Sequence, residues 1–185
     1  MFSKNQQNEK MMPVSRRDLF CRCGQLLAVS AIGATALGSG LDRKFEGDLA
    51  ILNIALGLEH QAIAAYDAGA GSKLLSPAQL KVAVSFQNEH KRHRDTLIKY
   101  IRRFGGTPVA AKSSYDFGTI TSAADILKLA HDLEEGAAKA YLANAYKLES
   151  REILSAAMPI LVDEVRHTTV FNQLLGLSVT DRIKV

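Results

Sequence analysis

Glutamate and histidine residues recur in this chain at a nearly constant offset. Glu134 follows Glu59 by 75 positions. His167 follows His93 by 74 positions, and Glu164 lies three positions before His167. Carboxylates and imidazoles are ligands of transition metals, and residues three apart on a helix share one face. The repetition therefore predicts a duplicated two-helix unit whose helices direct metal ligands into a common core.

The second helices of the two units differ at one ligand position. Alignment places His90 opposite Glu164, so the first unit has His-x-x-His where the second has Glu-x-x-His. The six candidate ligands are Glu59, His90, His93, Glu134, Glu164 and His167. Their three carboxylates carry −3 against +4 for two divalent ions. The sequence therefore leaves open a single ion, an oxide or hydroxide bridge, or a further carboxylate contributed by Glu89.

Five more residues are placed where they can support these ligands. They are Glu89, His131, Asp163, Tyr66 and Tyr141. Glu89 and Asp163 occupy matching positions beside ligands of the two second helices, and His131 lies one turn before Glu134. The two tyrosines stand two turns beyond the first-helix glutamates and on the same face. Solvent exposure of His131 and core packing of the tyrosines are equally simple explanations of these positions.

Apolar residues at helical spacing predict an all-α chain. Four helices are expected, at about residues 47–70, 77–104, 122–145 and 151–175. Ser76 and either Thr121 or Ser122 are typical N-caps, and Gly176 is a typical C-terminal stop. Residues 105–120 have no helical periodicity and, when extended, can span about 55 Å, more than the length of a 25-residue helix. The expected fold is a four-helix bundle with a long crossover between helices 2 and 3.

Pro159 is the one residue that conflicts with this assignment. A proline inside a helix removes a backbone hydrogen bond and kinks the helix. The sequence therefore predicts either a kink before Glu164 or a fourth helix that begins late.

The net charge of +4 is unevenly distributed along the chain. Residues 1–36 hold five basic and two acidic side chains, and the rest of the chain holds 18 basic and 17 acidic. A nearly neutral domain has little electrostatic attraction to nucleic acid, which argues against DNA or RNA as a partner.

The N-terminal segment has the pattern of a signal peptide. Arg16 and Arg17 precede a short apolar run from Leu26 to Leu37, with Ala34-Thr35-Ala36 near its end. The paired arginines resemble the twin-arginine export signal, and the apolar run is too short for a permanent membrane span. We predict a signal peptide at 1–36, a linker at 37–46, the bundle at 47–176 and a tail at 177–185. The alternative is an amphipathic or disordered tail with an accidental arginine pair.

Cleavage of this segment defines the expected location and cysteine content of the mature protein. The chain is expected to use the twin-arginine export machinery and to reside in the periplasm or at the outer face of the cytoplasmic membrane. Both cysteines, Cys21 and Cys23, would be lost with the signal. A disulfide framework is therefore excluded.

Residues 47–176 resemble the ferritin-like superfamily, particularly its exported bacterial members. The resemblance rests on Glu59, Glu134 and the Glu164/His167 pair, and on Tyr115-Asp116-Phe117-Gly118 in the crossover. It implies a ligand set of one glutamate from each of two helices and Glu-x-x-His from each of the other two. His93 fits the remaining histidine, whereas His90 stands where that pattern has a glutamate.

The resemblance implies a redox metal protein. One or two transition-metal ions, with iron as the first candidate, would react with dioxygen or peroxide, for example as a ferroxidase. The sequence leaves manganese, zinc and copper open, as well as assembly into a homo-oligomer. Two other functions also stay open: a non-catalytic envelope or stress-protection module with a degenerate site, and disproportionation of peroxide by manganese.

Overall fold

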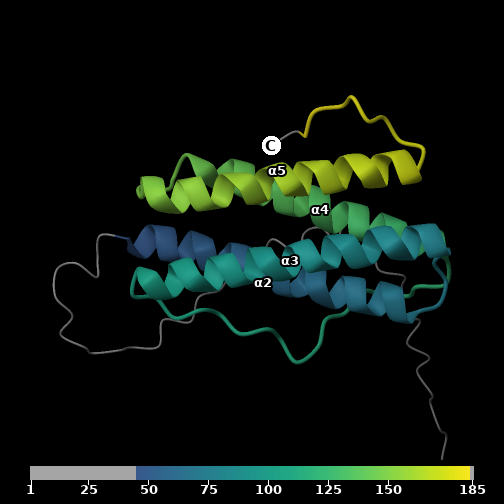
Figure 1. The fold of residues 1–185 in the computed structure, drawn as a ribbon, viewed down its shortest axis with the longest axis horizontal. Coiled ribbons are helices and arrows are strands. Elements are labelled where there is room, and N and C mark those ends of the chain that lie inside the picture. The colour runs from purple at the N-terminus through teal and green to yellow at the C-terminus, as the bar shows by residue number, and fades with distance from the viewer. Residues whose placement is uncertain (1–44, 184–185) are drawn as a thin grey trace, which may run out of the picture. The chain divides into compact units, whose positions relative to one another are not determined.

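The computed structural model describes residues 45–183, and this part of the chain contains helices and no strand. The helices are α2 (Glu46–Gly71), α3 (Pro77–Arg103), α4 (Ala123–Ala145) and α5 (Arg151–Leu174) (Figure 1). The predicted all-α four-helix bundle is therefore confirmed. The signal peptide predicted at 1–36, including Arg16 and Arg17, lies outside the described residues, as does most of the predicted linker.

Local side-chain chemistry explains where the helices begin and end. The Ser76 hydroxyl accepts a hydrogen bond from the Gln79 N–H, and the Gln79 side chain accepts one from the Ser76 N–H. Ser122 and Asp125 make the same reciprocal pair at the start of α4. Such pairs satisfy backbone donors that a helix N-terminus leaves free. Gly176 follows α5 with a φ of 68°, a conformation that favours glycine and ends a helix.

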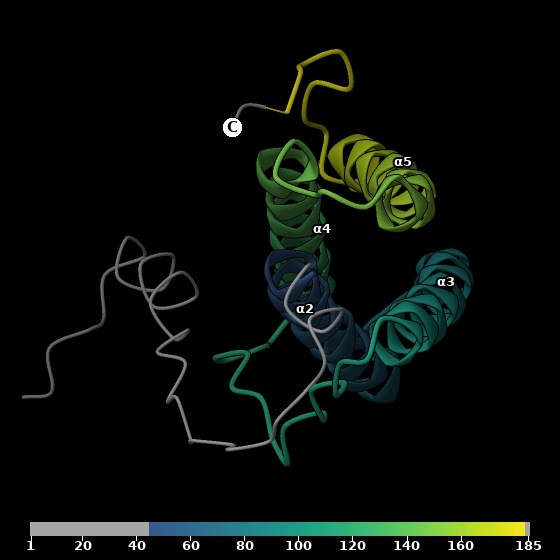
Figure 2. The same ribbon diagram turned by 90° about the vertical axis from the view of Figure 1, so that its left-hand side faces the viewer.

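The helices pack as two antiparallel pairs, α2 with α3 and α4 with α5. Helices α2 and α4 also pack against each other, whereas α3 and α5 make fewer contacts (Figure 2). The two pairs correspond to the two predicted sequence units. The seam between α3 and α5 is therefore the most loosely packed side of the bundle.

Two apolar clusters fill the core at different levels along the bundle. The first cluster includes Leu56, Leu97, Tyr141, Ile153 and Ile160. The second cluster includes Tyr66, Phe86, Leu127, Ala130 and Phe171. In every helix the predicted ligands lie between the residues of these two clusters. The polar residues therefore form one layer that apolar side chains enclose on both sides.

The crossover from α3 to α4 runs along the outside of the bundle (Figure 1). Asn53 on α2 holds it, donating to the Thr107 carbonyl at 3.2 Å and accepting from the Val109 N–H at 2.7 Å. His60 Nε2 also donates to the Val109 carbonyl, at 3.2 Å. His60 therefore binds the crossover rather than the ligand layer.

Helix α5 resolves the ambiguity at Pro159. The helix begins at Arg151, where Ser150 caps it, and continues through Pro159 to Leu174. The alternative that the fourth helix begins late is therefore wrong, and Pro159 lies inside the helix. Pro159 and Ser155 are both exposed, so water can satisfy the Ser155 carbonyl that the proline leaves without a donor.

Helix α2 is the one helix of residues 45–183 that is long and apolar enough to cross a membrane. Core helices of soluble proteins satisfy the same test. In this structure α2 contributes Leu56 and Tyr66 to the core clusters and carries a buried carboxylate, Glu59. These features are those of a bundle core helix.

Asp48 links the two halves of the bundle and should contribute strongly to stability. It is 1% exposed, and its carboxylate accepts the N–H groups of Glu149 and Ser150 at 2.9 and 2.8 Å. Asp48→Ala should lower the free energy of unfolding by about 3 kcal/mol, because it leaves buried donors unpaired. Thermal unfolding should show a Tm about 6 to 12 °C lower. Asp95→Ala, at an exposed ion pair with Arg94, should leave the Tm nearly unchanged.

Candidate metal centre

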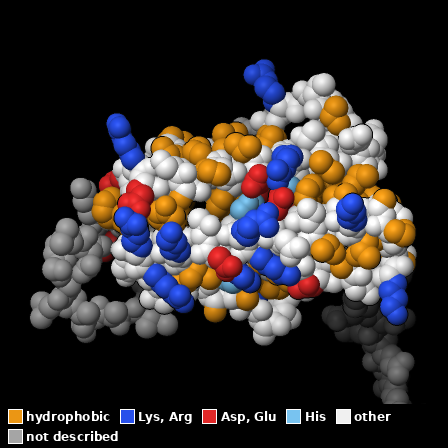
Figure 3. Space-filling view, in the orientation of Figure 1, with side chains coloured by type: hydrophobic (Ala, Val, Ile, Leu, Met, Phe, Trp, Pro, Cys, Tyr) orange, Lys and Arg blue, Asp and Glu red, His pale blue; other side chains and the backbone are white. Residues whose placement is uncertain are grey.

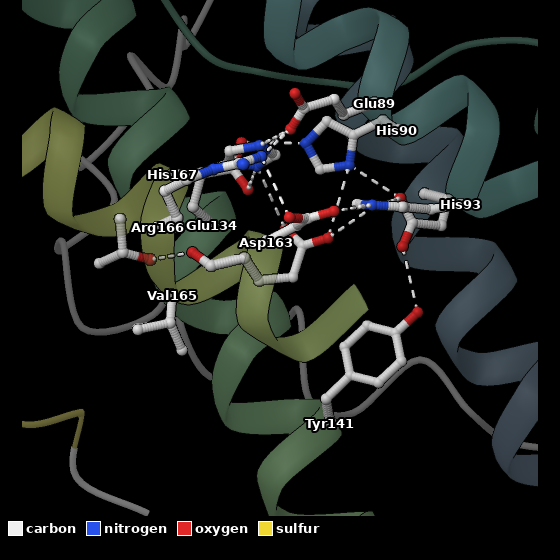
Figure 4. Close-up of polar contacts among 12 residues, drawn as sticks. Glu89, His90, His93, Glu134, Tyr141, Asp163, Val165, Arg166 and His167 are labelled. Carbon is white, nitrogen blue, oxygen red and sulfur yellow. Dashed lines mark hydrogen bonds and ion pairs between the residues drawn. The ribbon is translucent and has the colours of Figure 1, made fainter. Parts of the chain in front are cut away.

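The polar layer brings together all six candidate ligands from the four helices. Figure 4 labels His90, His93, Glu134 and His167 within this network. They are Glu59 from α2, His90 and His93 from α3, Glu134 from α4, and Glu164 and His167 from α5. Their exposed fractions lie between 0 and 6%. Burying so many ionisable groups is costly unless they pair with one another or bind metal.

The six residues form two clusters of four with shared members. The first cluster is Glu59, His90, His93 and Glu164, and the second cluster is His90, Glu134, Glu164 and His167. Within each cluster the ligand atoms lie within 4.8 Å of one another. His90 and Glu164 belong to both clusters. The arrangement can therefore hold two ions side by side.

Three atoms of this layer are buried without a hydrogen-bond partner among the described residues. They are His93 Nδ1 and both carboxylate oxygens of Glu164. Glu164 Oε1 lies 3.1 Å from His93 Nδ1, and Glu164 Oε2 lies 3.8 Å from His167 Nδ1. These atoms are held by ion-pair contacts rather than by well-aligned hydrogen bonds, which is unusual for buried polar atoms. Their types and positions fit the ligands of a bound metal, with one oxygen of Glu164 in each cluster.

The outer nitrogens of the two terminal histidines are fixed by acidic residues of the opposite half. His93 Nε2 lies 3.1 Å from Asp163 Oδ2, and His167 Nε2 lies 2.7 Å from Glu89 Oε2. Each Nε2 donates its proton outward, which leaves Nδ1 facing the clusters. Carboxylates commonly orient metal-binding histidines in this way. Glu89 and Asp163 thus contact the outer nitrogens of the candidate ligands, and Glu89 lies against His167 rather than inside a cluster.

The two tyrosines also hold ligands of the opposite half. The Tyr66 hydroxyl donates to Glu134 Oε1, and the Tyr141 hydroxyl donates to Glu59 Oε1 at 3.1 Å. Burial and the adjacent carboxylates raise the pKa of both phenols well above 10. Both tyrosines therefore remain neutral donors. They fix one oxygen of each glutamate, while the other oxygen contacts a histidine of the clusters: Glu59 Oε2 contacts His90, and Glu134 Oε2 contacts His167.

His131 lies apart from this network. Its Nε2 is 2.9 Å from Asn172 Oδ1, and its Nδ1 is 3.1 Å from Asp132 Oδ1. These contacts connect α4 with α5, and neither partner is one of the six candidate ligands. His131 is therefore a suitable control position for experiments on the metal centre.

Phe86 is a supporting residue that the sequence did not reveal. Its ring stacks on His167 with a centroid separation of 3.9 Å. The only available signal was its position one helical turn before His90, on the ligand-bearing face of α3. Stacking restricts rotation of the imidazole and so helps to keep Nδ1 directed at the second cluster.

Burial and mutual charge determine the protonation of the metal-free layer. Burial, together with the charge of Glu59, raises the pKa of Glu164 to about 7, although two histidines oppose the shift. Burial alone would lower the pKa of His93, but Glu164 and Glu59 outweigh it and raise that pKa to about 10. Glu134 and Glu164 likewise outweigh burial and raise the pKa of His167 to about 9. Without metal, the histidines therefore hold protons, whereas burial is outweighed by neighbouring histidines that lower the pKa values of Glu59 and Glu134 and keep these two carboxylates ionised.

Charged side chains cover the layer along the seam between α3 and α5. Arg166 pairs with Glu89 and, at 3.1 Å, with Asp163, while Arg92 lies 3.6 Å from Glu89. Figure 3 shows acidic and basic side chains gathered here around visible histidine atoms. This seam is also the side of the bundle where the helices make the fewest contacts.

Glu89 should matter for metal affinity although it lies in neither cluster. Glu89→Ala removes the acceptor of the His167 Nε2 proton and frees the ring to rotate. We expect metal affinity to fall about 10- to 100-fold, measured by competition with a chromophoric chelator. Glu152→Ala is the control, because it removes a different ion pair between α3 and α5, that of Glu152 with Arg103. This pair lies far from the clusters along the seam, so the metal affinity should not change. Equal losses in both variants would contradict this role.

The metal-free protein should lose stability as the pH rises. His93 and His167 bind protons more tightly in the folded protein, where their pKa values are about 10 and 9, than in the unfolded chain, where an ordinary histidine has a pKa of 6.5. Their proton binding therefore adds to the free energy of unfolding. This stabilisation is complete below about pH 6.5 and is lost as the pH rises through 9 and 10. The raised pKa of Glu164, about 7, acts in the same direction. The Tm of chelator-treated protein should fall by about 5 °C or more from pH 6 to pH 9.5.

A double replacement provides the control for this pH dependence. His93→Gln combined with His167→Gln should flatten the decline, because the two groups no longer titrate. His131→Gln should retain it. A decline that is identical in all three proteins would show that other groups cause it.

The profile of the ferritin-like domain family matches residues 47–177. The chain belongs to the ferritin-like domain family. Among curated proteins, no sequence match was found.

Two solved structures resemble this ferritin-like bundle. A conserved hypothetical protein from Mycobacterium tuberculosis has a TM-score of 0.65 and 27% identity, with 75% of this chain and all of that chain covered. A structure described as ferritin-like, diiron-carboxylate proteins, from Bacillus anthracis, has a TM-score of 0.62 and 20% identity, with 75% and 99% covered. The second likeness shows the fold alone at this identity. The ferritin-like resemblance inferred from the sequence is confirmed for the family and the fold.

Proposed function

We propose that this protein holds two transition-metal ions in its polar layer, with iron as the first candidate, and uses them in redox chemistry with dioxygen or peroxide. The observation that carries the proposal is the pair of buried clusters with unsatisfied ligand atoms. A solved structure of the same fold is described as a diiron-carboxylate protein, which makes iron the first metal to test. When bound, the ions would supply the electrons that reduce the oxidant.

The protein's own residues position the ligands and exclude water. Glu59 and Glu134 each have one oxygen held by a tyrosine, so they offer a preoriented carboxylate without loss of side-chain entropy. The apolar clusters above and below the layer keep it dry, which strengthens the interaction between carboxylates and cations. At the seam between α3 and α5, Arg166 pairs with Glu89, which in turn holds His167.

We also propose export by the twin-arginine route on the strength of Arg16, Arg17 and the apolar run that follows. This route carries folded proteins, so the metal can be inserted before export. A fusion of residues 1–46 to a reporter, with and without Arg16→Lys and Arg17→Lys, tests the proposal. Export that persists in the double variant would contradict it.

Metal content and ferrous oxidation of two variants test the proposed function. Glu59→Ala and His167→Ala each remove a ligand from one cluster only. Each variant should lose metal and should oxidise ferrous ion no faster than buffer, whereas His131→Ala should behave as the unchanged protein. Full metal content in both ligand variants would contradict the proposal. Circular dichroism provides the check that the helices remain folded.

A metal-free structural module is the second candidate, and one observation favours it. His90 lies 2.8 Å from Glu59 Oε2 and 3.0 Å from Glu134 Oε1, so a histidine with both nitrogens protonated satisfies both carboxylates without metal. In that case, the purified protein should contain no metal. Reconstitution with ferrous, manganous, zinc or cupric ions should then fail as well.

A further inference from the structure

His90 lies at the point where the two clusters meet. Its Nδ1 is 2.8 Å from Glu59 Oε2 and 3.8 Å from Glu164 Oε1, both in the first cluster. Its Nε2 is 3.0 Å from Glu134 Oε1, in the second cluster. The two ring nitrogens of one side chain therefore face two different clusters. At 1% exposure, the ring is fully enclosed between them.

Several distances in the two clusters are close to those of atoms that share one ion. Ligand atoms at about 2.0 to 2.2 Å from a metal stand about 3.0 to 3.4 Å apart in octahedral or tetrahedral geometry. In the first cluster, His93 Nδ1 is 3.1 Å from Glu164 Oε1 and 3.7 Å from Glu59 Oε2. In the second cluster, His167 Nδ1 is 3.2 Å from Glu134 Oε2. Only small movements would bring each set around an ion.

We propose that His90 is a bridging ligand that binds one ion through Nδ1 and a second ion through Nε2. Glu164 supports the same bridge, since its two oxygens face the two clusters. The inference rests on the proposed dinuclear function and specifies how the two ions are joined. It also restricts the metal class to ions that accept imidazole nitrogen, such as iron, copper, zinc and nickel, and excludes magnesium and calcium.

The bridge also accounts for the charge of the ligand set. Three carboxylates supply −3, which leaves two divalent ions undercompensated by one charge. An imidazole that binds metal through both nitrogens has released its ring protons to solvent and carries −1. The total is then −4 against +4. His90 in a position where the family resemblance implies a glutamate thus preserves neutrality through a different chemical group.

Cupric ion is the most informative probe of the bridge. Cupric ion binds nitrogen ligands more tightly than the other divalent first-row metal ions do. An imidazole that joins two cupric ions couples their unpaired electrons. We expect the metal-free full chain to take up two cupric ions. Its electron paramagnetic resonance signal at liquid-helium temperature should account for only a minor share of the bound copper. His131→Gln should behave identically.

His90→Gln is the decisive variant, because glutamine has no second ring nitrogen. We expect the copper bound by this variant to give a larger and less strongly coupled signal than that of the unchanged protein, because Glu164 alone would then connect the two clusters. Two ions with full signal in the unchanged protein, or a His90→Gln signal as strongly coupled as that of the unchanged protein, would overturn the bridge. Neither result would affect the proposed metal function, which fails only if the unchanged protein binds no transition metal.

Anomalous diffraction from copper-loaded crystals separates a bridge from a terminal ligand. Each ring nitrogen of His90 should lie about 2.0 to 2.1 Å from a different ion. An ion at one nitrogen only, or a His90 ring turned away from both ions, would overturn the inference. This holds even if the electron paramagnetic resonance signal in solution shows coupled cupric ions.

Discussion

Replacing Glu164 with Ala should remove both metal ions, whereas replacing Glu59 with Ala should weaken the first cluster alone. Glu164 presents one unsatisfied oxygen to each cluster, and Glu59 belongs to the first cluster only. Losing a ligand from both positions at once should reduce metal content at equilibrium from about two ions per chain to a trace. Elemental mass spectrometry of the dialysed variants measures this directly.

Glu135→Ala is the matched control for that experiment. Glu135 is adjacent to Glu134 on α4, but it pairs with Lys139 at 3.1 Å and stays outside both clusters. Its replacement should leave the metal content unchanged. If Glu164→Ala retained two ions while remaining helical, the assignment of Glu164 to both clusters would be wrong.

Saturating the protein with metal should raise its thermal stability substantially. Bound ions satisfy buried atoms that otherwise lack partners, and binding to the folded chain alone stabilises it by about 4 kcal/mol at a thousandfold excess over Kd. For a chain of this size the Tm should rise by about 8 to 16 °C and return to its starting value when a chelator is added. Differential scanning calorimetry at pH 7 provides the measurement.

The Glu164→Ala protein again distinguishes specific from general effects of the metal. It should show no comparable rise in Tm at the same metal concentration. An equal rise in both proteins would mean that the metal stabilises the chain from another site. An unchanged Tm in the original protein despite measured binding would contradict the claim that the layer needs metal.

The architecture was predictable because local signals agreed with the global fold. Helical spacing, the Ser76 and Ser122 caps and the Gly176 stop placed the four helices within one or two residues of the structure. The repeat then brought the ligands to one level, because equivalent residues of two antiparallel pairs lie at equivalent heights. Pro159 was ambiguous, since one sequence cannot reveal whether its missing hydrogen bond faces solvent.

Interactions between the halves could be predicted only in part. Spacing made Glu89, Asp163 and the tyrosines possible supporting residues, with core packing as an alternative for the tyrosines, but it did not predict their partners. Tyr66 binds Glu134 of the other half rather than Glu59, which shares its helix. Such partners depend on how the pairs are rotated against each other, which helical periodicity does not encode. The orientation of the His90 ring was likewise visible only in the structure.

These crossed contacts show why neither two-helix unit can form the site alone. His93 needs Asp163, His167 needs Glu89, and each first-helix glutamate is held by a tyrosine of the other unit. The ligands are therefore oriented only when both units are packed together. Metal binding and packing of the two halves should accordingly be coupled.

The most direct test of this account is the metal content of the full chain, purified without chelators and measured by elemental mass spectrometry. The account predicts about two transition-metal ions per chain, either as purified or after reconstitution with ferrous ion. Protein that is fully helical but holds no metal after both treatments would contradict the dinuclear centre. In that case, His90 and its surrounding carboxylates would be a metal-free structural network.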